Sequence, residues 1–315
     1  MSLAATAFYQ IIIMFLLILI GIICYRIRLI DQNTNKKLSD IVLMLVSPVL
    51  IIISYQREYD ETLLSGLFIS LILAVITHIF GIVIGKVMLR GEKHRENLPI
   101  EQFAVIYSNC GFIGIPMAGG LFGSEGVFYI TAYLTIFNLL VWTHGVIIMT
   151  GKGGSKSDKR NIKSMGKALL SPSIIAAVVG FLLFITRIML PEVLKDTLTY
   201  ISDMNTPLAM LVAGVTIAQT DIKKLFVKLR IYYISFIKLL LIPIAMLFIF
   251  RLFNVPNVVI LTSVLAAACP TAATVNLFAI RYEKNYLYAS ELFAVSTITS
   301  MVTIPFVMYI SNLLL

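Results

Sequence analysis

Ten runs of mostly apolar residues, each about as long as a membrane-spanning helix, divide this chain. A helix needs about 20 apolar residues to cross the hydrocarbon core of a bilayer. Apolar residues make up 59% of the 315 residues and charged residues only 13%, more apolar surface than a soluble chain could cover. We therefore expect an all-α integral membrane protein with ten spans, at residues 7–25, 38–55, 63–89, 101–122, 127–150, 167–190, 198–219, 229–253, 256–280 and 286–313.

The positive charges lie mainly in every second connection between these runs. Of the 25 Lys and Arg residues, Lys238 lies inside an expected span and only four lie in the even-numbered connections, namely Arg57, Arg187, Lys195 and Arg251. Cytoplasmic connections carry the excess of Lys and Arg. We expect a multi-pass protein of the plasma membrane with both termini outside the cytoplasm. The net charge of +9 then reflects membrane topology and does not indicate a nucleic-acid partner.

The fourth apolar run is interrupted in its middle by the sequence SNCGFIGIP at residues 108–116. Two glycines and a proline weaken a helix there, and an asparagine places an amide at mid-depth. An unpaired backbone group in hydrocarbon costs several kcal/mol, so a broken helix persists only where protein, water or a bound solute satisfies the freed groups. This stretch is therefore a candidate site, although a packing kink would explain a single break equally well.

A second interruption appears when the two halves of the chain are compared. A Gly/Lys/Ser-rich stretch at residues 151–166, which we expect to be a cytoplasmic linker, separates five spans (residues 1–150) from five more (residues 167–315). The second half must then start from the opposite side of the membrane. Pro48 and Pro207 are 159 positions apart, as are Cys110 and Cys269, and the same spacing places the first interruption on AACPTAATV at residues 267–275. Paired interrupted helices in inverted repeats indicate a transport site at the midplane.

The two breaks favour an anion. Each half-helix that starts at a break presents unpaired N–H groups and about half a positive charge, which suits a carboxylate. Asn109 supplies side-chain donors at the first break, and Thr271, Thr274 and Asn276 can do so at the second. Asn109 can also cap the following half-helix, and the two roles are compatible. We therefore predict a transporter of organic anions.

Further residues of the predicted site also have structural explanations. Asn138 lies near mid-depth in the fifth run and either lines the cavity or makes an interhelical hydrogen bond. The backbone of both breaks is freed by a set of small or cyclic residues, which we expect to shape the site rather than to contact substrate through side chains: Gly111, Gly114, Pro116 and Pro270.

Three ionisable residues are candidates for coupling. Lys238 lies well inside the eighth run, where a cation is expensive unless it is paired or hydrated, and it either balances charge or extends to the inner face. His78 near mid-depth in the third run either carries a proton or packs as a neutral residue. Glu291 in the tenth run either reaches the interface or pairs with Lys238. The sequence shows no two-carboxylate sodium site, so we expect proton coupling or uniport.

These motifs resemble the auxin efflux carrier family, which includes the plant PIN-formed carriers and bacterial carriers assigned to malate and malonate. The likeness covers the whole chain and rests on SNxGFxGxP at 108–116, PLAMLVAG at 207–214, Cys269-Pro270 leading to FAxxY at 278–282, and Ser296-Thr297 with Pro305. It implies two inverted five-helix repeats in which helices 4 and 9 cross at their breaks, similar to sodium/bile-acid symporters and sodium/proton antiporters. Helices 1, 2, 6 and 7 would form a scaffold, and helices 3–5 and 8–10 a transport domain.

The resemblance also bears on the substrate. In the plant members an asparagine before the first crossover proline helps to hold the substrate carboxylate, and Asn109 matches it. The plant second crossover reads proline, glutamine, glycine, whereas this chain has Pro270, Thr271 and Ala272, so the contact from that side stays open. The long cytoplasmic loop of many plant members is absent. We expect a malate- or malonate-like mono- or dicarboxylate rather than auxin, and related folds make a homodimer plausible.

Other functions fit the sequence less well. An anion channel needs a continuous polar or basic ring, which the spans do not offer apart from Lys238. An intramembrane enzyme needs paired acids, a nucleophile with its base, or metal ligands, and only three histidines and no such pair are present. The sequence suggests no cofactor and no metal. A sensor that binds carboxylates without turnover would use the same residues as a carrier and stays open.

Overall fold

The computed structural model describes residues 3–89, 96–150, 172–219 and 228–315. The expected linker at 151–166 and part of the positively charged connections lie outside these residues. The described chain is helical throughout, apart from connections and one isolated β-bridge. Its elements are α1 (Leu3–Arg26), α2 (Gln32–Ile41), η1 (Val42–Val46), α3 (Ser47–Ser54), α4 (Glu61–Met88), α5 (Leu98–Ile106), η2 (Cys110–Gly114), α6 (Ile115–Leu140), η3 (Val141–Gly145), α7 (Val146–Thr150), α9 (Pro172–Ile185), α10 (Glu192–Asp203), α11 (Asn205–Ala218), α13 (Leu229–Phe236), η4 (Ile237–Leu241), α14 (Ile242–Phe250), α15 (Asn257–Ala268), α16 (Thr274–Arg281) and α17 (Tyr286–Leu314), where η marks a π-helical turn.

Seven continuous helical stretches in the described residues are long and apolar enough to cross a membrane. Two shorter apolar helices, α9 and α15, accompany them. The sequence predicts ten spans, and the difference has local causes. Two of the expected spans are cut into short pieces at residues 107–109 and 269–273, and part of the sixth lies outside the described residues. The fourth and fifth runs also join within a single stretch, Cys110–Thr150.

Gly123 marks the place where the fourth and fifth runs meet. It is the one residue inside α6 with a non-helical backbone, at φ 61° and ψ −152°. This region of φ and ψ is essentially restricted to glycine. The chain therefore changes direction inside α6, between the expected end of one helix at residue 122 and the expected start of the next at residue 127.

The first turns of α2 and α4 are fixed by acidic caps. The Asp31 carboxylate accepts a hydrogen bond from the Thr34 N–H at 2.7 Å, and α2 accordingly begins before the apolar run that sets in at Leu38. The Asp60 carboxylate accepts from the Thr62 N–H at 2.6 Å and starts α4 at Glu61. An aspartate at this position satisfies N–H groups that the helix cannot pair itself. Both caps lie outside the apolar runs.

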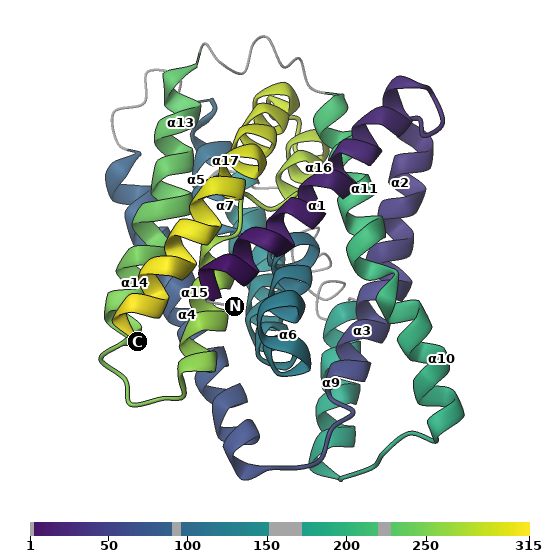
Figure 1. Ribbon diagram of the computed structural model, residues 1–315. Coiled ribbons are helices and arrows are strands. Elements are labelled where there is room, and N and C mark those ends of the chain that lie inside the picture. The colour runs from purple at the N-terminus through teal and green to yellow at the C-terminus, as the bar shows by residue number, and fades with distance from the viewer. Residues whose placement is uncertain (1–2, 90–95, 151–171, 220–227) are drawn as a thin grey trace.

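Glycines bring α1 and α11 together. A Cβ atom on Gly214 would lie 2.2 Å from the Ile18 carbonyl oxygen, and one on Gly21 would lie 2.5 Å from that of Leu211. The two backbones are therefore in direct contact, as small residues allow between membrane helices. Figure 1 shows α2, α3, α9, α10 and α11 on one side of the molecule and α4, α5, α13, α14 and α15 on the other, with α1 between them.

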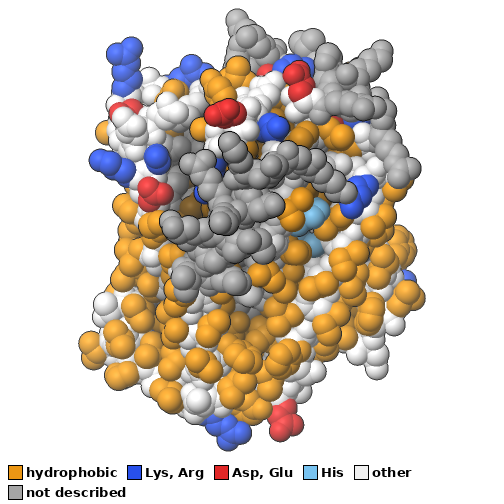
Figure 2. Space-filling view, turned by 180° about the vertical axis from the view of Figure 1, so that it is seen from behind, with side chains coloured by type: hydrophobic (Ala, Val, Ile, Leu, Met, Phe, Trp, Pro, Cys, Tyr) orange, Lys and Arg blue, Asp and Glu red, His pale blue; other side chains and the backbone are white. Residues whose placement is uncertain are grey.

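The surface has a wide apolar band. Figure 2 shows hydrophobic side chains over most of one face, while Lys, Arg, Asp and Glu gather towards the two ends. Large apolar side chains such as Ile72 and Phe248 are more than half exposed. Exposed apolar area on this scale marks a surface that contacts lipid rather than water.

Candidate functional site at two interrupted helices

The first interruption follows α5. Tyr107 has an extended backbone (φ −99°, ψ 115°), and Asn109 is also non-helical (φ −77°, ψ 51°) before η2 begins at Cys110. The Asn109 carbonyl then accepts hydrogen bonds from the N–H groups of Ile113 and Gly114 at 3.1 and 3.2 Å. Pro116 has no N–H to contribute, and it lies in the first turn of α6, the position that proline tolerates best. The sequence thus breaks the helix for only a few residues.

The second interruption follows α15. Cys269 is extended (φ −59°, ψ 147°), and α16 begins at Thr274. Residues before a proline are pushed away from helical conformation, which explains why the helix ends directly ahead of Pro270. The break therefore lies where the spacing of 159 residues predicts it.

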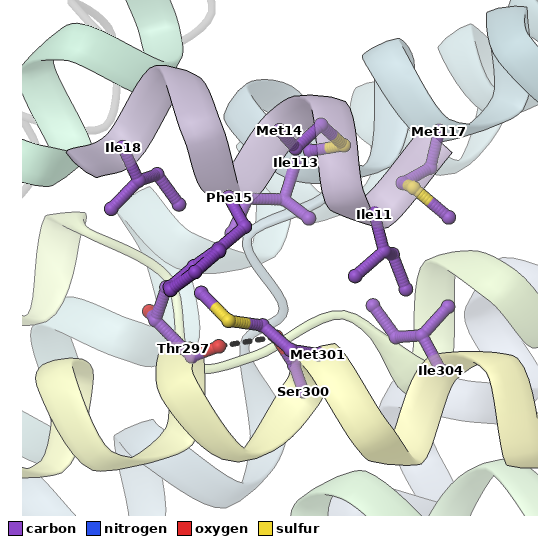
Figure 3. A pocket seen from close by; sticks show the side chains of 10 residues that line it. All are labelled: Ile11, Met14, Phe15, Ile18, Ile113, Met117, Thr297, Ser300, Met301 and Ile304. Atoms are coloured by element: carbon purple, nitrogen blue, oxygen red, sulfur yellow. Dashed lines mark hydrogen bonds between the residues drawn. The ribbon is translucent and has the colours of Figure 1, made fainter. Parts of the chain in front are cut away.

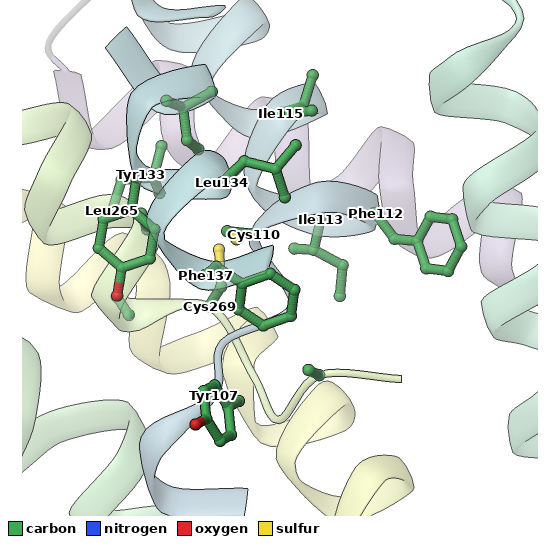
Figure 4. Close-up of a cluster of buried hydrophobic side chains, with 14 of the residues drawn as sticks. Tyr107, Cys110, Phe112, Ile113, Ile115, Tyr133, Leu134, Phe137, Leu265 and Cys269 are labelled. Carbon is green, nitrogen blue, oxygen red and sulfur yellow. The ribbon is translucent and has the colours of Figure 1, made fainter. Parts of the chain in front are cut away.

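The two interruptions meet. The Asn109 N–H donates to the Pro270 carbonyl at 2.7 Å, and the Ala272 N–H donates to the Tyr107 carbonyl at 2.9 Å. Ser108 and Thr271 form an isolated antiparallel β-bridge between them. Figure 4 shows the two extended segments crossing beside Cys110 and Cys269. Each break thus satisfies backbone groups that the other leaves open, as a low-dielectric interior requires.

Gly114 allows this close approach, whereas Gly111 is under less pressure from its neighbours. A Cβ atom on Gly114 would lie 2.9 Å from Ile130 Cδ1 and 3.2 Å from Cys269 Sγ, so a larger residue would require these two side chains to shift. On Gly111 the nearest atom would be a Leu134 methyl at 3.6 Å, an ordinary contact. The two glycines therefore differ: Gly114 is closely packed against its neighbours, whereas Gly111 has room for a small side chain.

Lys238 reaches the crossing from η4. Its ammonium donates to Ser108 Oγ at 2.5 Å, and the residue is only 1% exposed. The side chain therefore does not extend to the membrane surface. A cation at this depth is costly unless it is paired, hydrated or used. Among the described residues, its hydrogen bond goes to a neutral hydroxyl and not to a carboxylate.

Two polar atoms at the crossing have no hydrogen-bond partner. They are Nδ2 of Asn109, a residue that is 5% exposed, and Oγ1 of Thr274. Asn109 directly precedes η2 and Thr274 opens α16, so both lie where a half-helix presents its N-terminus. A buried donor without a partner costs about 1–3 kcal/mol. A ligand with anionic oxygens would remove that cost and would also interact with both N-termini.

The other predicted site residues of the second break already have partners. The Thr271 hydroxyl donates to the Ala104 carbonyl at 3.3 Å, and the Thr271 N–H donates to Ser296 Oγ at 3.2 Å. Asn276 Oδ1 accepts from the Ser290 hydroxyl at 3.3 Å. These residues tie the second break to α5 and α17. Asn138 is partly buried near the end of α6, and no hydrogen bond of its side chain joins it to the crossing.

Neither of the other two coupling candidates is hydrogen-bonded to Lys238 among the described residues. The ring of His78 is fully buried in α4, with Nδ1 hydrogen-bonded to the Ala74 carbonyl at 2.7 Å and Nε2 without a partner. It packs against Tyr133 with ring centroids 5.1 Å apart. Glu291 does not pair with Lys238, because its carboxylate forms an ion pair with Lys228 at 2.5 Å.

Sequence reasoning missed a buried ion pair in the first turn of α5, the helix that leads to the first break. Glu101 on α5 is 1% exposed, and its carboxylate pairs with the Arg230 guanidinium at 2.7 Å and accepts from the Tyr288 hydroxyl at 2.8 Å. The pair joins α5, α13 and α17. From the sequence alone, Arg230 looks like one more cation in a connection between spans. Its pairing with Glu101 is visible only in the folded chain.

A small cavity lies next to η2, between α1, α6 and α17 (Figure 3). Most of its lining is apolar, including Ile113 and Met117, and Thr297 Oγ1 is buried there without a hydrogen-bond partner. The Ser300 hydroxyl instead donates to the Thr297 carbonyl at 2.7 Å. In the described part of the chain, no three His, Cys, Asp or Glu residues are grouped to hold a metal ion.

Comparison with known proteins gives the family. Residues 6–308 match the family model described as "Membrane transport protein". Full-length relatives include an uncharacterised transporter of Methanothermobacter thermautotrophicus (25% identical, covering 92% of this chain and 93% of the relative) and the uncharacterised transporter YfdV of Escherichia coli K12 (22%, covering 94% and 95%). A Rhizobium meliloti protein that carries the provisional name of malonate transporter is 24% identical, covering 90% of this chain and 89% of the relative. This chain belongs to the membrane transport protein family, which is the family of the auxin efflux carriers.

Proposed function

We propose that this membrane transporter is a secondary carrier of small organic anions, mono- or dicarboxylates of the malate or malonate type. The observation that carries the proposal is the crossing itself. Two interrupted helices pair at their breaks, and the side-chain nitrogen Nδ2 of Asn109 is left there without a hydrogen-bond partner. The name of the Rhizobium meliloti relative supports malonate as the first compound to test.

The substrate carboxylate would bind between the two N-termini. One oxygen would accept from Asn109 Nδ2 and from the start of η2, and the other from Thr274 Oγ1 and the start of α16. Each helix N-terminus contributes about half a positive charge. The rest of the molecule would extend towards the cavity beside η2, where the Thr297 hydroxyl is buried without a hydrogen-bond partner. Release would follow when the site opens to one side and water replaces these contacts.

Alternating access would come from an inverted repeat of residues 1–150 and 167–315. Two further features support the repeat. The second expected helix is interrupted by η1 just before Pro48, and the seventh is interrupted at Met204 just before Pro207. The scaffold would consist of α1, α2–α3, α9 and α10–α11, whose backbone contact at Gly21 and Gly214 leaves little freedom to move. The crossing would move against it within the plasma membrane, with both termini outside.

Uptake into proteoliposomes tests the proposal. We expect saturable uptake of labelled malonate that is accelerated by unlabelled malonate on the opposite side. Unsaturable current would indicate an anion channel, and binding without flux would indicate a sensor. The same assay with an imposed pH gradient tests proton coupling, for which buried His78 is the candidate carrier. Crosslinking in the membrane tests for a homodimer.

Asn109→Ala tests the site itself. Because Nδ2 of Asn109 has no hydrogen-bond partner in the structure, the substitution should leave the thermal unfolding temperature measured without ligand almost unchanged. A hydrogen bond to a charged group contributes about 1.5–3 kcal/mol, so the stabilisation by malonate should require at least tenfold more ligand. Asn138→Ala is the matched control, because it removes an asparagine outside the crossing. Equal stabilisation of the Asn109→Ala protein and the unaltered protein would remove Asn109 from the site.

A further inference from the structure

Four helix ends converge at the crossing, and their charges oppose one another. The N-termini of η2 and α16 each carry about half a positive charge, whereas the C-termini of α5 and α15 each carry about half a negative charge. The hydrogen bonds between residues 107–109 and 270–272 hold all four ends together. On their own, the two negative ends would cancel the attraction that the two positive ends have for an anion.

Lys238 lies where it can neutralise the negative ends. The π-helical turn η4 packs against both α5 and α15. The Lys238 ammonium donates to Ser108, which is two residues beyond the end of α5, and Ser108 forms the β-bridge with Thr271, three residues beyond the end of α15. One ammonium carries about the charge that two helix C-termini need.

The neighbouring carboxylates do not neutralise this cation. Glu101 is paired with Arg230, and Glu291 is paired with Lys228. The other titratable groups that act on or lie near Lys238 are Cys110 and Cys269 at the breaks and His78 on α4. Among the described residues, Lys238 therefore has helix ends and neutral side chains as partners rather than an acidic residue.

We propose that Lys238 is a built-in cation of the crossing, a positioning residue that neutralises the C-termini of α5 and α15 and so leaves the two N-termini free to attract the substrate anion. The expected effect on malonate uptake rests on the proposed function. The neutralisation of the two C-termini by Lys238 does not. It gives Lys238 a different role from a direct substrate ligand. It also means that the site needs no bound metal cation, so malonate uptake should be equal in sodium and choline media.

Chemical rescue tests this role. Lys238→Ala removes the charge and leaves space for a small amine, whereas Lys238→Met removes the charge and fills the space. We expect both variants to lose most malonate uptake. Ethylammonium chloride should raise the unfolding temperature of ligand-free Lys238→Ala and restore part of its uptake. It should have no such effect on Lys238→Met or on the unaltered protein, and choline chloride at equal ionic strength should not replace it.

The outcomes separate this proposal from its alternatives. Uptake by Lys238→Met at the unaltered level, or a requirement for sodium in the unaltered protein, would overturn the built-in cation. So would ethylammonium that stabilises Lys238→Ala only when malonate is present, because that result assigns Lys238 to the substrate. If Lys238→Ala is not recovered folded, Lys238→Met and the sodium comparison decide. If the unaltered protein takes up no carboxylate, the proposed function fails, while the thermal shift without ligand still tests the role of the charge.

Discussion

The contact between α1 and α11 and the crossing of the two breaks solve opposite problems. At α1 and α11, Gly21 and Gly214 bring backbone against backbone with no polar side chain in the contact that they make. At the crossing, Ser108, Lys238 and Asn109 are buried polar residues, and the side-chain nitrogen Nδ2 of Asn109 lacks a hydrogen-bond partner. The first region gains van der Waals contact and holds two helices fixed. The second retains unsatisfied groups that each cost about 1–3 kcal/mol.

The difference shows that the destabilising, unsatisfied polar groups of this fold lie at the crossing and not at the contact between α1 and α11. A membrane protein cannot leave polar groups unsatisfied next to lipid, but it can do so where water or a solute visits. Glycine contacts elsewhere make that possible, because they fix the helices that do not take part. We therefore expect substitutions at α1 and α11 to act on folding, and substitutions at the crossing to act on ligand binding.

Arg230→Ala should have the largest effect, and it tests how much the ion pair at the start of α5 contributes to folding. It would leave the buried Glu101 carboxylate without its cation. Breaking a buried pair costs about 3–5 kcal/mol, and we expect the lower end because the Arg230 side chain is 31% exposed. Thermal and denaturant-induced unfolding in mixed micelles would measure the loss.

Two matched variants test the reason for that loss. Glu101→Gln combined with Arg230→Ala should be more stable than Arg230→Ala alone, since no charge is then left buried. Lys228→Ala removes a cation that is 46% exposed, against 31% for Arg230, and leaves the Glu291 side chain, which is 8% exposed, without it, so it should cost less than Arg230→Ala but more than the loss of a fully exposed pair. If Glu101→Gln combined with Arg230→Ala is no more stable than Arg230→Ala alone, the buried charge of Glu101 is not the cause of the loss and our interpretation of this pair is wrong.

Gly214→Ala would break the other side of the comparison. The new methyl group would meet the Ile18 carbonyl oxygen at 2.2 Å, and a backbone atom cannot rotate away. Overpacking typically costs about 1–3 kcal/mol, and we expect the upper end. Gly85→Ala is the control, because its nearest neighbours lie at 4.0 Å and alanine favours a helix by about 0.5–1 kcal/mol. A stable Gly214→Ala protein would show that α1 and α11 are free to separate.

The same contrast explains what the sequence could predict. Both breaks could be located because their causes are local: glycines and Pro116 at the first, Pro270 at the second, and a spacing that relates them. The side-chain donor at the first break could be predicted because Asn109 lies directly before the helix start. The ends of the helices were predicted less accurately. The helix α2, for example, starts after the Asp31 cap, ahead of its apolar run.

Partners across the fold could not be read from the sequence. The hydrogen bond from Lys238 to Ser108 joins residues 130 positions apart, and the pair of Glu101 and Arg230 joins residues 129 apart. No periodicity or motif encodes such a meeting. It depends on how η4 and α13 pack against α5. Thr271 and Asn276 were predicted from residue type alone, and the structure gives both of them protein partners.

Thr274→Val sharpens the distinction between folding and binding at the crossing. Valine has nearly the shape of threonine, and the Thr274 hydroxyl has no partner to lose, so the ligand-free protein should unfold at the same temperature or slightly higher. Malonate affinity should fall by about 0.5–1.5 kcal/mol, the value of an ordinary hydrogen bond. Thr262→Val, which removes a hydroxyl bonded to the Val258 carbonyl, is the control for folding. Unchanged malonate affinity would confine the site to the first break.

Asp60→Asn should have the smallest effect, and it calibrates any pH dependence found at the crossing. Hydrogen bonds from the Thr62 hydroxyl and the Thr62 N–H hold the pKa of Asp60 below its ordinary value. A carboxyl group with a lowered pKa contributes stability above its unfolded pKa and loses it as the pH falls through the folded pKa. Asparagine still caps the helix but does not titrate. The difference in unfolding temperature between the unaltered protein and Asp60→Asn should therefore be small and constant near neutral pH and should shrink in acid. A pH dependence of uptake that survives in Asp60→Asn does not come from this cap, whereas one that vanishes would have to be assigned to it.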